Sequence, residues 1–518
     1  MVVRTLTTLT RLLDILSLLA PDRRIQVFFT YDDQNTAILG SDIDAYLRNL
    51  EAHVITWDAA RRSSFALAIA ASENDRLAEL NAPVLLVPHG LGFLKHYPGT
   101  TVVAGMDPAR LVQDERVVPA AIALSHRDQR DQLRRSCPQA APLSVVVGDP
   151  CLDRLLAFRH HARRHRKVLD SAGKHVVVLA STWGPESLFG RMADLPGRLV
   201  SELPADEFTV LLVLHPGVHA AHSTWRLRGW LSEATRSGVV LVPPHGEWRS
   251  VLTAASCVIS DSGSLALYAA ALDKPILLTG TSATSVPNSP IVALHSLAPR
   301  VDPDRPLRGQ LEVAMGDHIP GMYADIVDRS ANYQTRSAHR LRPLLYRLMN
   351  LAEPTDEAAF PPIPGFRADN PPVAAFVAGV DSTADGLGLS RYPAMSVGEP
   401  ELSYRHVAAH VDHATVTELD GATVLYLSSG DTAIEETLSQ WPRAEIAAMP
   451  GPGPSCQVWT RDGTALELRV DAPSVDPLLL ASLVQVRRDQ GRPLANVERI
   501  RVGSRTIDVH VQPLVQVR

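Results

Sequence analysis

The segment Cys257-Val258-Ile259-Ser260-Asp261-Ser262-Gly263-Ser264-Leu265-Ala266-Leu267-Tyr268 decides the fold of this 518-residue chain. Its first four residues predict a buried strand, the next four a turn of small residues, and the remainder the start of a helix. Asp273-Lys274-Pro275 ends that helix, and the apolar run 275–278 predicts the next strand. A strand, a helix and a further strand in this order are typical of a parallel α/β sheet.

Similar apolar runs recur along the first two thirds of the chain, each followed by a turn and a more polar stretch of helical length. The first series of predicted strands comprises 25–30, 53–57, 65–70, 84–87, 120–124 and 144–147. The second series comprises 175–180, 209–214, 239–242, 257–260 and 275–278. Two such series predict an α/β fold of two doubly wound, Rossmann-like domains, over residues 1–155 and 156–350.

The composition changes near residue 350. Pro361-Pro362-Ile363-Pro364-Gly365 and Pro371-Pro372 predict a semi-rigid linker over 351–372, because proline lacks an amide donor and favours extended backbone. Beyond the linker, strand-like runs occur at 374–378, 422–427, 466–470 and 507–511. We therefore expect an additional C-terminal α/β or α+β unit over residues 373–518, with an accessory role.

Composition and charge exclude several classes of protein. The chain is 45% hydrophobic and 20% charged, which excludes a largely disordered protein. With 50 Lys and Arg against 56 Asp and Glu, the net charge is −6, so we expect no nucleic-acid partner. The four cysteines, Cys137, Cys151, Cys257 and Cys456, form no C-x-x-C pair. Neither a zinc ribbon nor a disulfide framework is indicated, and we expect a cytoplasmic protein.

Two segments bear on membrane contact. The apolar run at 12–20 resembles a signal-peptide core, but Arg11 and Asp14 interrupt it, no cleavage site follows, and its apolar positions fit a helix. No run of about 20 uncharged apolar residues occurs, so we expect at most a peripheral contact with a membrane. The basic run 159–167 predicts a solvated helix face or linker, with an anionic-surface contact as the alternative.

The first candidate site residue is His89, in Val87-Pro88-His89-Gly90-Leu91-Gly92-Phe93-Leu94-Lys95 after the strand at 84–87. Ligands of open α/β sheets bind at the carboxyl ends of the strands, so His89 is placed to project into such a crevice. Its imidazole, with a reference pKa near 6.5, can take a proton from an attacking hydroxyl. Gly90 would let a substrate approach the backbone. The alternative is that His89 caps a following helix.

The second domain repeats this geometry. The strand at 209–214 runs into His215-Pro216-Gly217, where an imidazole can donate a hydrogen bond to a diphosphate. In the turn after 257–260, the hydroxyls of Ser262 and Ser264 and the amide of Gly263 would lie at a helix N-terminus, which is a ready anion site. The alternative is that Asp261, Ser262 and Ser264 only cap the helix.

Five segments, in order, resemble those of the CDP-glycerol glycerophosphotransferases that polymerise or prime wall teichoic acids, a family with the GT-B type of glycosyltransferase fold. His89-Gly90 with Lys95 is similar to H-G-T-P-L-K, with the lysine one residue late, and residues 148–155 are similar to G-x-P-R-x-D-x-L, with Cys151 in place of the arginine. Leu179-Ala180-Ser181-Thr182-Trp183 is similar to Y-A-P-T-W, and His215-Pro216 to R-x-H-P, with Val213 in place of the arginine. Ser260-Asp261-Ser262-Gly263-Ser264 is similar to T-D-Y-S-S, and Tyr268 stands at the position of an acidic residue.

This resemblance spans residues 85 to 280 and implies a transferase. His89 would be the base that activates an acceptor hydroxyl, and His215, Ser262, Gly263 and Ser264 would hold the diphosphate of a nucleotide-activated donor. Gly90, Lys95, Asp261 and Thr182 would support them. The resemblance implies no metal and no cofactor, and an acceptor hydroxyl on a polymer or a lipid-linked chain. The departures at Cys151, Val213 and Tyr268 remove polar contacts and leave the donor open.

Two other functions compete with this one. Asp261-Ser262-Gly263-Ser264 and Asp273-Lys274-Pro275 also resemble motifs of UDP-N-acetylglucosamine 2-epimerases, although Ala266, Leu267 and Tyr268 replace the paired glutamates that can hold a ribose. A degenerate relative that binds a nucleotide or a partner without chemistry is the other alternative.

Two further segments give weaker signals. The pairs His160-His161 and His219-His222 lack a carboxylate or cysteine at ligand spacing, so we expect no metal site. The loop Pro243-Pro244-His245-Gly246-Glu247-Trp248 either lines a base pocket or simply packs.

Overall fold

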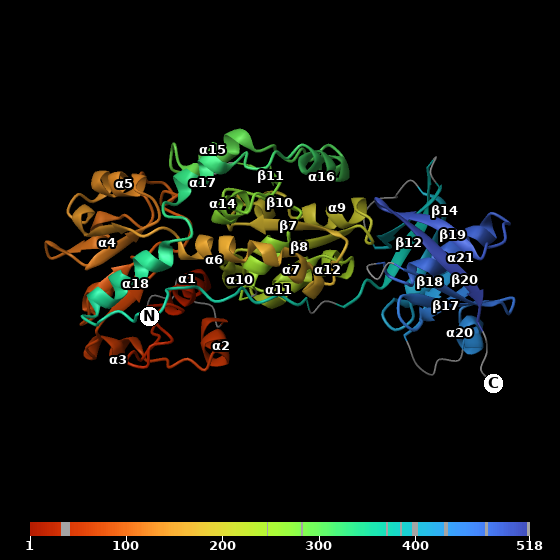
Figure 1. Ribbon diagram of the computed structural model, residues 1–518, viewed down its shortest axis with the longest axis horizontal. Helices are drawn as coiled ribbons and strands as arrows, with labels where there is room; N and C mark the ends of the chain where they lie inside the picture. The colour runs from red at the N-terminus through yellow and green to blue at the C-terminus, as the bar shows by residue number, and fades with distance from the viewer. Residues whose placement is uncertain are drawn as a thin grey trace.

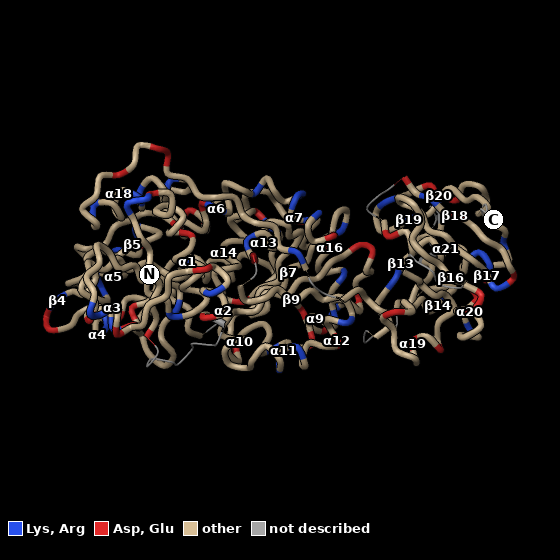
Figure 2. Tube along the Cα trace, turned by 90° about the horizontal axis from the view of Figure 1, so that it is seen from below, with Lys and Arg blue, Asp and Glu red and all other residues tan. Residues whose placement is uncertain are grey.

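The computed structural model describes residues 1–32, 42–245, 247–280, 283–368, 371–383, 386–395, 402–428, 434–471 and 475–514. Figure 1 shows three units along the longest axis, which are a first parallel sheet, a second parallel sheet and a C-terminal barrel. Basic and acidic residues are interspersed along all three units (Figure 2). None of the helices in the described ranges combines the length and apolar character that crossing a membrane requires.

The first unit is built on a parallel sheet with the strand order β1-β2-β5-β6. Its strands are β1 (Ala68–Ala70), β2 (Val84–Leu86), β5 (Ala121–Leu124) and β6 (Ser144–Val146), and the pair β3 (Val112–Gln113) and β4 (Arg116–Val117) lies apart. Its helices are α1 (Leu6–Leu16), α2 (Asp42–Asn49), α3 (Trp57–Arg62), α4 (Pro108–Leu111), α5 (Asp128–Ser136) and α6 (Pro150–Phe158), with 3-10 turns η1 (Leu77–Glu79) and η2 (Ala141–Leu143). Neighbouring strand residues such as Leu85 and Leu86 point into different cores, so apolar side chains cover both faces of the sheet.

Two predicted strands of this unit are wrong. Residues 25–30 and 53–57 are extended in part, but they form only isolated bridges, between Phe29 and Val54 and between Thr30 and Val2. Trp57 instead begins α3, where Thr56 caps the helix by accepting from the Ala59 amide. The predicted N-terminal helix is confirmed as α1, whose apolar side pairs with α18 (Ser337–Leu348) in the core under the first sheet.

The second unit has a five-stranded parallel sheet with the order β11-β10-β7-β8-β9. Its strands, β7 (His175–Ser181), β8 (Phe208–Leu214), β9 (Val240–Val242), β10 (Cys257–Ser260) and β11 (Ile276–Leu278), match the five predicted runs to within one residue at each end. Its helices are α7 (Ala162–Val168), α8 (Leu188–Arg191), α9 (Leu195–Glu202), α10 (Pro216–His222), α11 (Thr224–Trp230), α12 (Ser232–Arg236), α13 (Trp248–Ala254), α14 (Ser264–Ala271), α15 (Pro290–Leu297), α16 (Leu307–Gly316) and α17 (Ala324–Ser330). Alternate residues of the buried strands again fill two cores, one on each face.

The basic run forms η3 (Arg159–His161) and α7, and only part of it is solvated. His165 is buried, and Arg166 donates to the Ala254 carbonyl at the end of α13, so α7 packs on that helix. The proline-rich segment that follows α18 runs along the second unit toward the barrel (Figure 1). It is held there by hydrogen bonds from Arg154 to the Pro361 and Pro362 carbonyls; residues 369 and 370 lie outside the described ranges.

The C-terminal unit is a closed nine-stranded barrel, in the order β12-β13-β19-β20-β18-β17-β16-β15-β14. Its elements are β12 (Ala375–Thr383), β13 (Gly386–Pro393), β14 (Ser403–His410), α19 (Val416–Gly421), β15 (Val424–Tyr426), α20 (Ile434–Gln440), β16 (Ile446–Pro450), β17 (Ser455–Thr460), β18 (Ala465–Val470), α21 (Leu479–Asp489), β19 (Val497–Val502) and β20 (Arg505–Pro513). The first eight residues of α21 are buried, and this helix contacts every strand from β12 to β17. The sequence predicted an α/β or α+β unit here and indicated four of its strands; the unit does combine helices with strands, but its nine strands close into a barrel, which the sequence did not indicate.

The barrel is attached to the second unit through Arg391 of β13. Its guanidinium donates to both oxygens of Asp206, at 2.7 and 3.0 Å, and to Asp476 at 2.7 Å. Arg391 and Asp206 are both buried, and the Arg391 carbonyl also accepts from the Ala205 amide. Two opposite charges buried away from water are tolerated only when they pair in good geometry, so this ion pair fixes how the barrel is positioned on the second unit.

Candidate active site

The largest concentration of candidate residues lines one cavity between the first and second sheets. In the second sheet the chain runs from β7 to β8 and β9 on one side and to β10 and β11 on the other, so the order reverses between β7 and β10. Ligands of such sheets bind outside the carboxyl ends of the strands at this point. All candidates predicted from the sequence line the cavity: His89, Gly90, Lys95, Thr182, His215, Asp261, Ser262, Gly263 and Ser264.

His89 follows β2 in a loop that leads to the second unit. No helix begins before α4 at Pro108, so the alternative that His89 caps a helix is wrong. The ring is exposed to the cavity, but protein surrounds the cavity on most sides. This desolvation lowers the pKa of His89 below its ordinary value; Arg11 and Lys95 lower it further, and Glu73 opposes them. His89 is therefore a neutral imidazole at neutral pH, able to accept a proton.

His215 follows β8 and is the N-cap of α10. Its Nδ1 accepts from the Gly217 amide at 3.0 Å, so the proton of the neutral ring is on Nε2. Desolvation lowers the pKa of His215 to about 3, with further lowering by His89, Lys95 and His219. The ring is thus a neutral donor, and it lines the same cavity as His89.

Asp261 is a buried hub that joins the ends of β7 and β10. Its Oδ2 accepts from the Thr182 amide and hydroxyl, both at 2.8 Å, and from the Leu188 amide at 2.9 Å. Its Oδ1 accepts from the Gly263 amide at 3.1 Å. With four donors satisfied inside the protein, this carboxylate positions the turn, and Thr182 with it.

The turn at 262–264 presents its donors to the cavity. Gly263 is the N-cap of α14 and has no side chain; of the three residues in the capping alternative, Asp261 accepts from the Gly263 amide at the start of the helix. The Ala266 amide donates to the Gly263 carbonyl at 3.2 Å, whereas the Ser264 and Leu265 amides at the start of the helix have no partner within it. A Cβ at Gly90 would lie 3.4 Å from Ser264 Oγ, so the loop of the first unit approaches the start of α14 closely. The structure thus brings the predicted donors of this turn together at the cavity, and their binding of an anion stays a prediction.

Lys95 adds a positive charge to the lining of this cavity. It lies in a short bridge between the two units, where Lys95 pairs with Ser285 and the Leu94 carbonyl accepts from the Val286 amide. Desolvation lowers the pKa of Lys95, while Asp261 and Glu186 raise it. The bridge holds the ammonium group beside the cavity.

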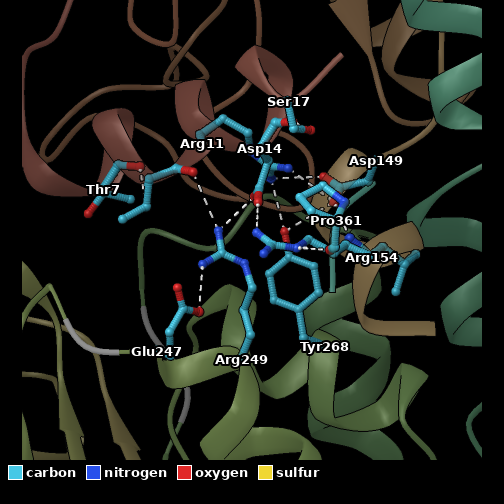
Figure 3. A network of polar contacts seen from close by, with 12 residues as sticks. Thr7, Arg11, Asp14, Ser17, Asp149, Arg154, Glu247, Arg249, Tyr268 and Pro361 are labelled. Carbon is cyan, nitrogen blue, oxygen red and sulfur yellow. Dashed lines mark hydrogen bonds and ion pairs between the residues drawn. The ribbon is translucent and has the colours of Figure 1, made fainter. Parts of the chain in front are cut away.

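A buried polar network forms another wall of the cavity (Figure 3). Arg11 of α1 donates to both oxygens of Asp149, at 3.1 and 2.8 Å, and to the Tyr268 hydroxyl at 2.9 Å. The Tyr268 hydroxyl in turn donates to Asp149 at 3.3 Å. The family position of an acidic residue is thus filled by a phenol whose hydroxyl is bound within the protein.

The same helix supplies Asp14, which bridges Arg154 of α6 and Arg249 of α13 in the second unit. Asp14 accepts from Arg154 at 2.9 Å and from Arg249 at 2.6 Å (Figure 3). Arg249 lies over the Trp248 ring, with 4.9 Å from Cζ to the ring centroid. Sequence analysis missed Arg11, Asp14 and Arg249 as site residues, although the two charges inside the apolar pattern of α1 were the signal that could have found them.

The two other departures from the family pattern also line the cavity. Cys151 is buried, and desolvation raises the pKa of its thiol to about 11, so it is neutral. Val213 presents an apolar side chain. Trp248 lines the cavity and also packs on Tyr268, with 5.5 Å between the ring centroids, so its packing role is confirmed. That the loop lines a base pocket stays a prediction, and Gly246 lies outside the described residues.

Within the part of the chain that the structure describes, no group of three or more His, Cys, Asp or Glu side chains could hold a metal ion. His160 and His161 pack edge to face, with ring centroids 4.4 Å apart, next to Phe158. His219 is buried in α10 behind His215, and His222 packs on Trp230. Each histidine pair thus has a packing role.

Comparisons with known proteins give similarities among solved structures. No protein-family model matches the sequence, and no curated protein matches it. The wall teichoic acid polymerase TagF (H548A) is similar at 13% identity with a TM-score of 0.46, over 66% of this chain and 85% of TagF. Anabaena Alr3699/HepE in complex with UDP is similar at 12% and 0.37, over 65% and 96%. A glycosyltransferase from Rickettsia africae is similar at 9% and 0.38, over 68% and 98%.

Proposed function

We propose that the chain is a metal-independent transferase of the GT-B type, which moves a glycerophosphate-like or glycosyl group from a nucleotide-activated donor to a hydroxyl. One observation supports this most directly. A neutral imidazole from the first unit and an uncapped helix N-terminus from the second face the same cavity, at the switch point of the second sheet. A base opposite an anion site is what such a transfer needs.

In the proposed reaction His89 takes the proton of the acceptor hydroxyl as its oxygen attacks. For a CDP-glycerol-like donor, an oxygen–phosphorus bond forms at the phosphorus that bears glycerol, and the bond from that phosphorus to the bridging oxygen breaks. The electron pair leaves with the nucleoside monophosphate. For a glycosyl donor the oxygen attacks the anomeric carbon, and a nucleoside diphosphate leaves. A positioned general base contributes about 10²- to 10⁴-fold in rate.

The leaving phosphates are proposed to be held by the second unit. His215 would donate through Nε2, because its Nδ1 is occupied by the Gly217 amide. Ser262, Ser264 and the first amides of α14 would donate to the same oxygens, and Lys95 would supply positive charge. These donors are fixed before the donor binds, since Asp261 holds the turn, and fixed dipoles stabilise developing charge without reorganisation. No cofactor is part of the proposal.

Turnover of a panel of CDP- and UDP-linked donors tests the reaction. His89→Ala should lower kcat by about 10²-fold or more and leave donor affinity within about twofold. His339→Ala is a matched control, because His339 is exposed on α18 and does not line the cavity. Equal turnover for the wild type and His89→Ala would remove the role proposed for His89.

A second candidate is a nucleotide-binding protein without catalysis. Cys151 and Val213 motivate it, because they stand where the family that the motifs resemble has arginines. Calorimetry separates the two, since nucleotide binding with no product from any acceptor would favour the binding protein. An epimerase is disfavoured, because Ala266 and Leu267, at the positions of the paired glutamates, are buried in the core.

We also propose a cytoplasmic location with peripheral contact to an anionic membrane surface, through α11. Trp225 is 84% exposed and Trp230 is 49% exposed, and Arg226 lies over the Trp230 ring. Exposed tryptophans with arginines on one short helix suit an anionic lipid interface. When the protein is sedimented with anionic vesicles, the wild type should appear in the pellet and the Trp225→Ala variant should not. Equal amounts of the wild type and the variant in the pellet would contradict this contact.

A further inference from the structure

A second cavity of about 690 Å³ lies between α5 of the first unit and the start of α15 in the second. We call it the α5–α15 groove. Leu91, Phe93 and Leu94 line both this groove and the cavity that contains His89. The loop after His89 is therefore a thin partition, with the reaction cavity on one side and the groove on the other.

The groove contains a helix N-terminus whose cap is unused. Ser289 is the N-cap of α15, an eight-residue helix, but its hydroxyl caps nothing. The side chain is buried, with 8% of the residue exposed, and Oγ has no hydrogen-bond partner. Pro290 follows without an amide hydrogen, and the next amides of a helix start have no intrahelical partner. A buried, unpartnered hydroxyl at a positive helix end indicates a missing acceptor.

Cationic and neutral donors face the same space. Arg135 of α5 and Arg329 of α17 line the groove, and Arg329 is held by the Asn288 carbonyl at 2.7 Å, next to Ser289. His126 is buried, and its Nδ1 accepts from the Asp128 amide at 3.1 Å, which leaves the proton of the neutral ring on Nε2. Asp128 also lines the groove, 3.5 Å from that Nδ1, so two arginines face one carboxylate there.

We propose that the α5–α15 groove is a second phosphate-binding site, separate from the reaction cavity. Ser289 Oγ and the start of α15 would donate to the phosphate oxygens, and Arg135 and Arg329 would supply the charge that an anion needs. This site does not depend on the proposed transferase activity. If that activity holds, a phosphate of the acceptor chain is one source of the ligand and free phosphate is the other.

Calorimetric titration with inorganic phosphate tests the site in the full-length chain. Ser262→Ala with Ser264→Ala is the background, because it weakens the anion site of the reaction cavity and leaves the groove intact. Adding Arg135→Gln and Arg329→Gln should weaken phosphate binding at least tenfold. Arg134→Gln is the matched control: Arg134 is the next residue of α5, pairs with Asp131 and does not line the groove, so affinity should stay within twofold.

The result that would overturn the proposal is equal phosphate affinity in the Arg135→Gln, Arg329→Gln protein and the Arg134→Gln control. Should the double variant fail to fold, Ser289→Ala removes one buried hydroxyl and should weaken phosphate binding at least threefold. Unchanged affinity would again overturn the site.

A phosphodiester-linked glycerol phosphate oligomer separates the two sources of the ligand. Tighter binding of the oligomer than of inorganic phosphate, lost in the same variants, assigns the groove to an acceptor chain; binding of inorganic phosphate alone assigns it to free phosphate. Nucleotide affinity of the serine background tests the reaction cavity independently.

Discussion

Replacing Asp261 with asparagine removes the charge from the hub that joins β7 and β10. The carboxylate accepts four hydrogen bonds, three of them at Oδ2. An asparagine can keep those three only if its carbonyl oxygen takes the place of Oδ2, and its NH₂ group then faces the Gly263 amide, which is also a donor. The bond to Gly263 is lost in that arrangement, and the other three become neutral.

The expected cost follows from these four bonds. Hydrogen bonds to a charged group contribute about 1.5–3 kcal/mol and neutral ones about 1 kcal/mol. Three bonds weakened by roughly 0.5–1 kcal/mol each and one bond of about 1.5 kcal/mol lost give a decrease of about 3–4.5 kcal/mol in the free energy of unfolding. Because the same turn presents Ser262 and Ser264, the affinity for a nucleoside diphosphate should fall about tenfold as well.

Urea unfolding followed by tryptophan fluorescence measures the first effect, and calorimetry with CDP or UDP measures the second. Asp194→Asn is the control, because Asp194 is an exposed carboxylate in the same unit whose side chain does not cap α9. It should change stability by less than about 0.5 kcal/mol. A loss below 1 kcal/mol for Asp261→Asn, or unchanged nucleotide affinity, would refute the role of Asp261 as the hub.

Three further outcomes are expected. Because the pKa of His89 is lowered below 6.5, its imidazole is still mostly neutral at pH 6.5. We therefore expect kcat/KM to stay constant as the pH falls to 6.5 and to decrease only at lower pH. A decrease centred at pH 6.5 or above would contradict this. Burial lowers the pKa of His406 from 6.5 to about 4, so the unfolded chain binds the extra proton between these values and stability falls as the pH drops below 6.5. At pH 5 the loss of stability from this histidine amounts to about 2 kcal/mol. His406→Gln should abolish this loss, which chemical denaturation at pH 7 and at pH 5 measures. An equal pH dependence of stability in the wild type and the variant would refute the prediction. Arg391→Met leaves Asp206 buried without its partner and should lower the free energy of unfolding by about 3–5 kcal/mol. The control Arg499→Met, at an exposed ion pair, should lower it by less than about 1 kcal/mol. Similar losses for the two variants would contradict the role of Arg391 in attaching the barrel.

The second sheet could be predicted from the sequence because its strands are buried on both faces. Each strand is a short continuous apolar run, and each ends at a polar turn. The same rule brought His89, His215 and Ser262 together, since parallel strands point their carboxyl ends the same way. The runs at 25–30 and 53–57 met the same composition rule, but they found no partner strand beyond single bridges.

The rest of the site depends on contacts between distant segments. Arg11 reaches Asp149 and Tyr268 across 138 and 257 residues of chain, and no spacing within α1 specifies those partners. Closure of the barrel similarly depends on the pairing of β12 with β14 and of β13 with β19. Pairing of this kind has no local signal, because each strand by itself shows only an alternating pattern.

A crystal structure with a bound nucleoside diphosphate, CDP or UDP, tests the central claim most directly. The diphosphate should lie within hydrogen-bond distance of His215 Nε2, of the Ser262 or Ser264 hydroxyl, and of the first amides of α14, with His89 facing it across an open space. A nucleotide bound with its phosphates away from α14, or with His89 turned out of the cavity, would contradict the account.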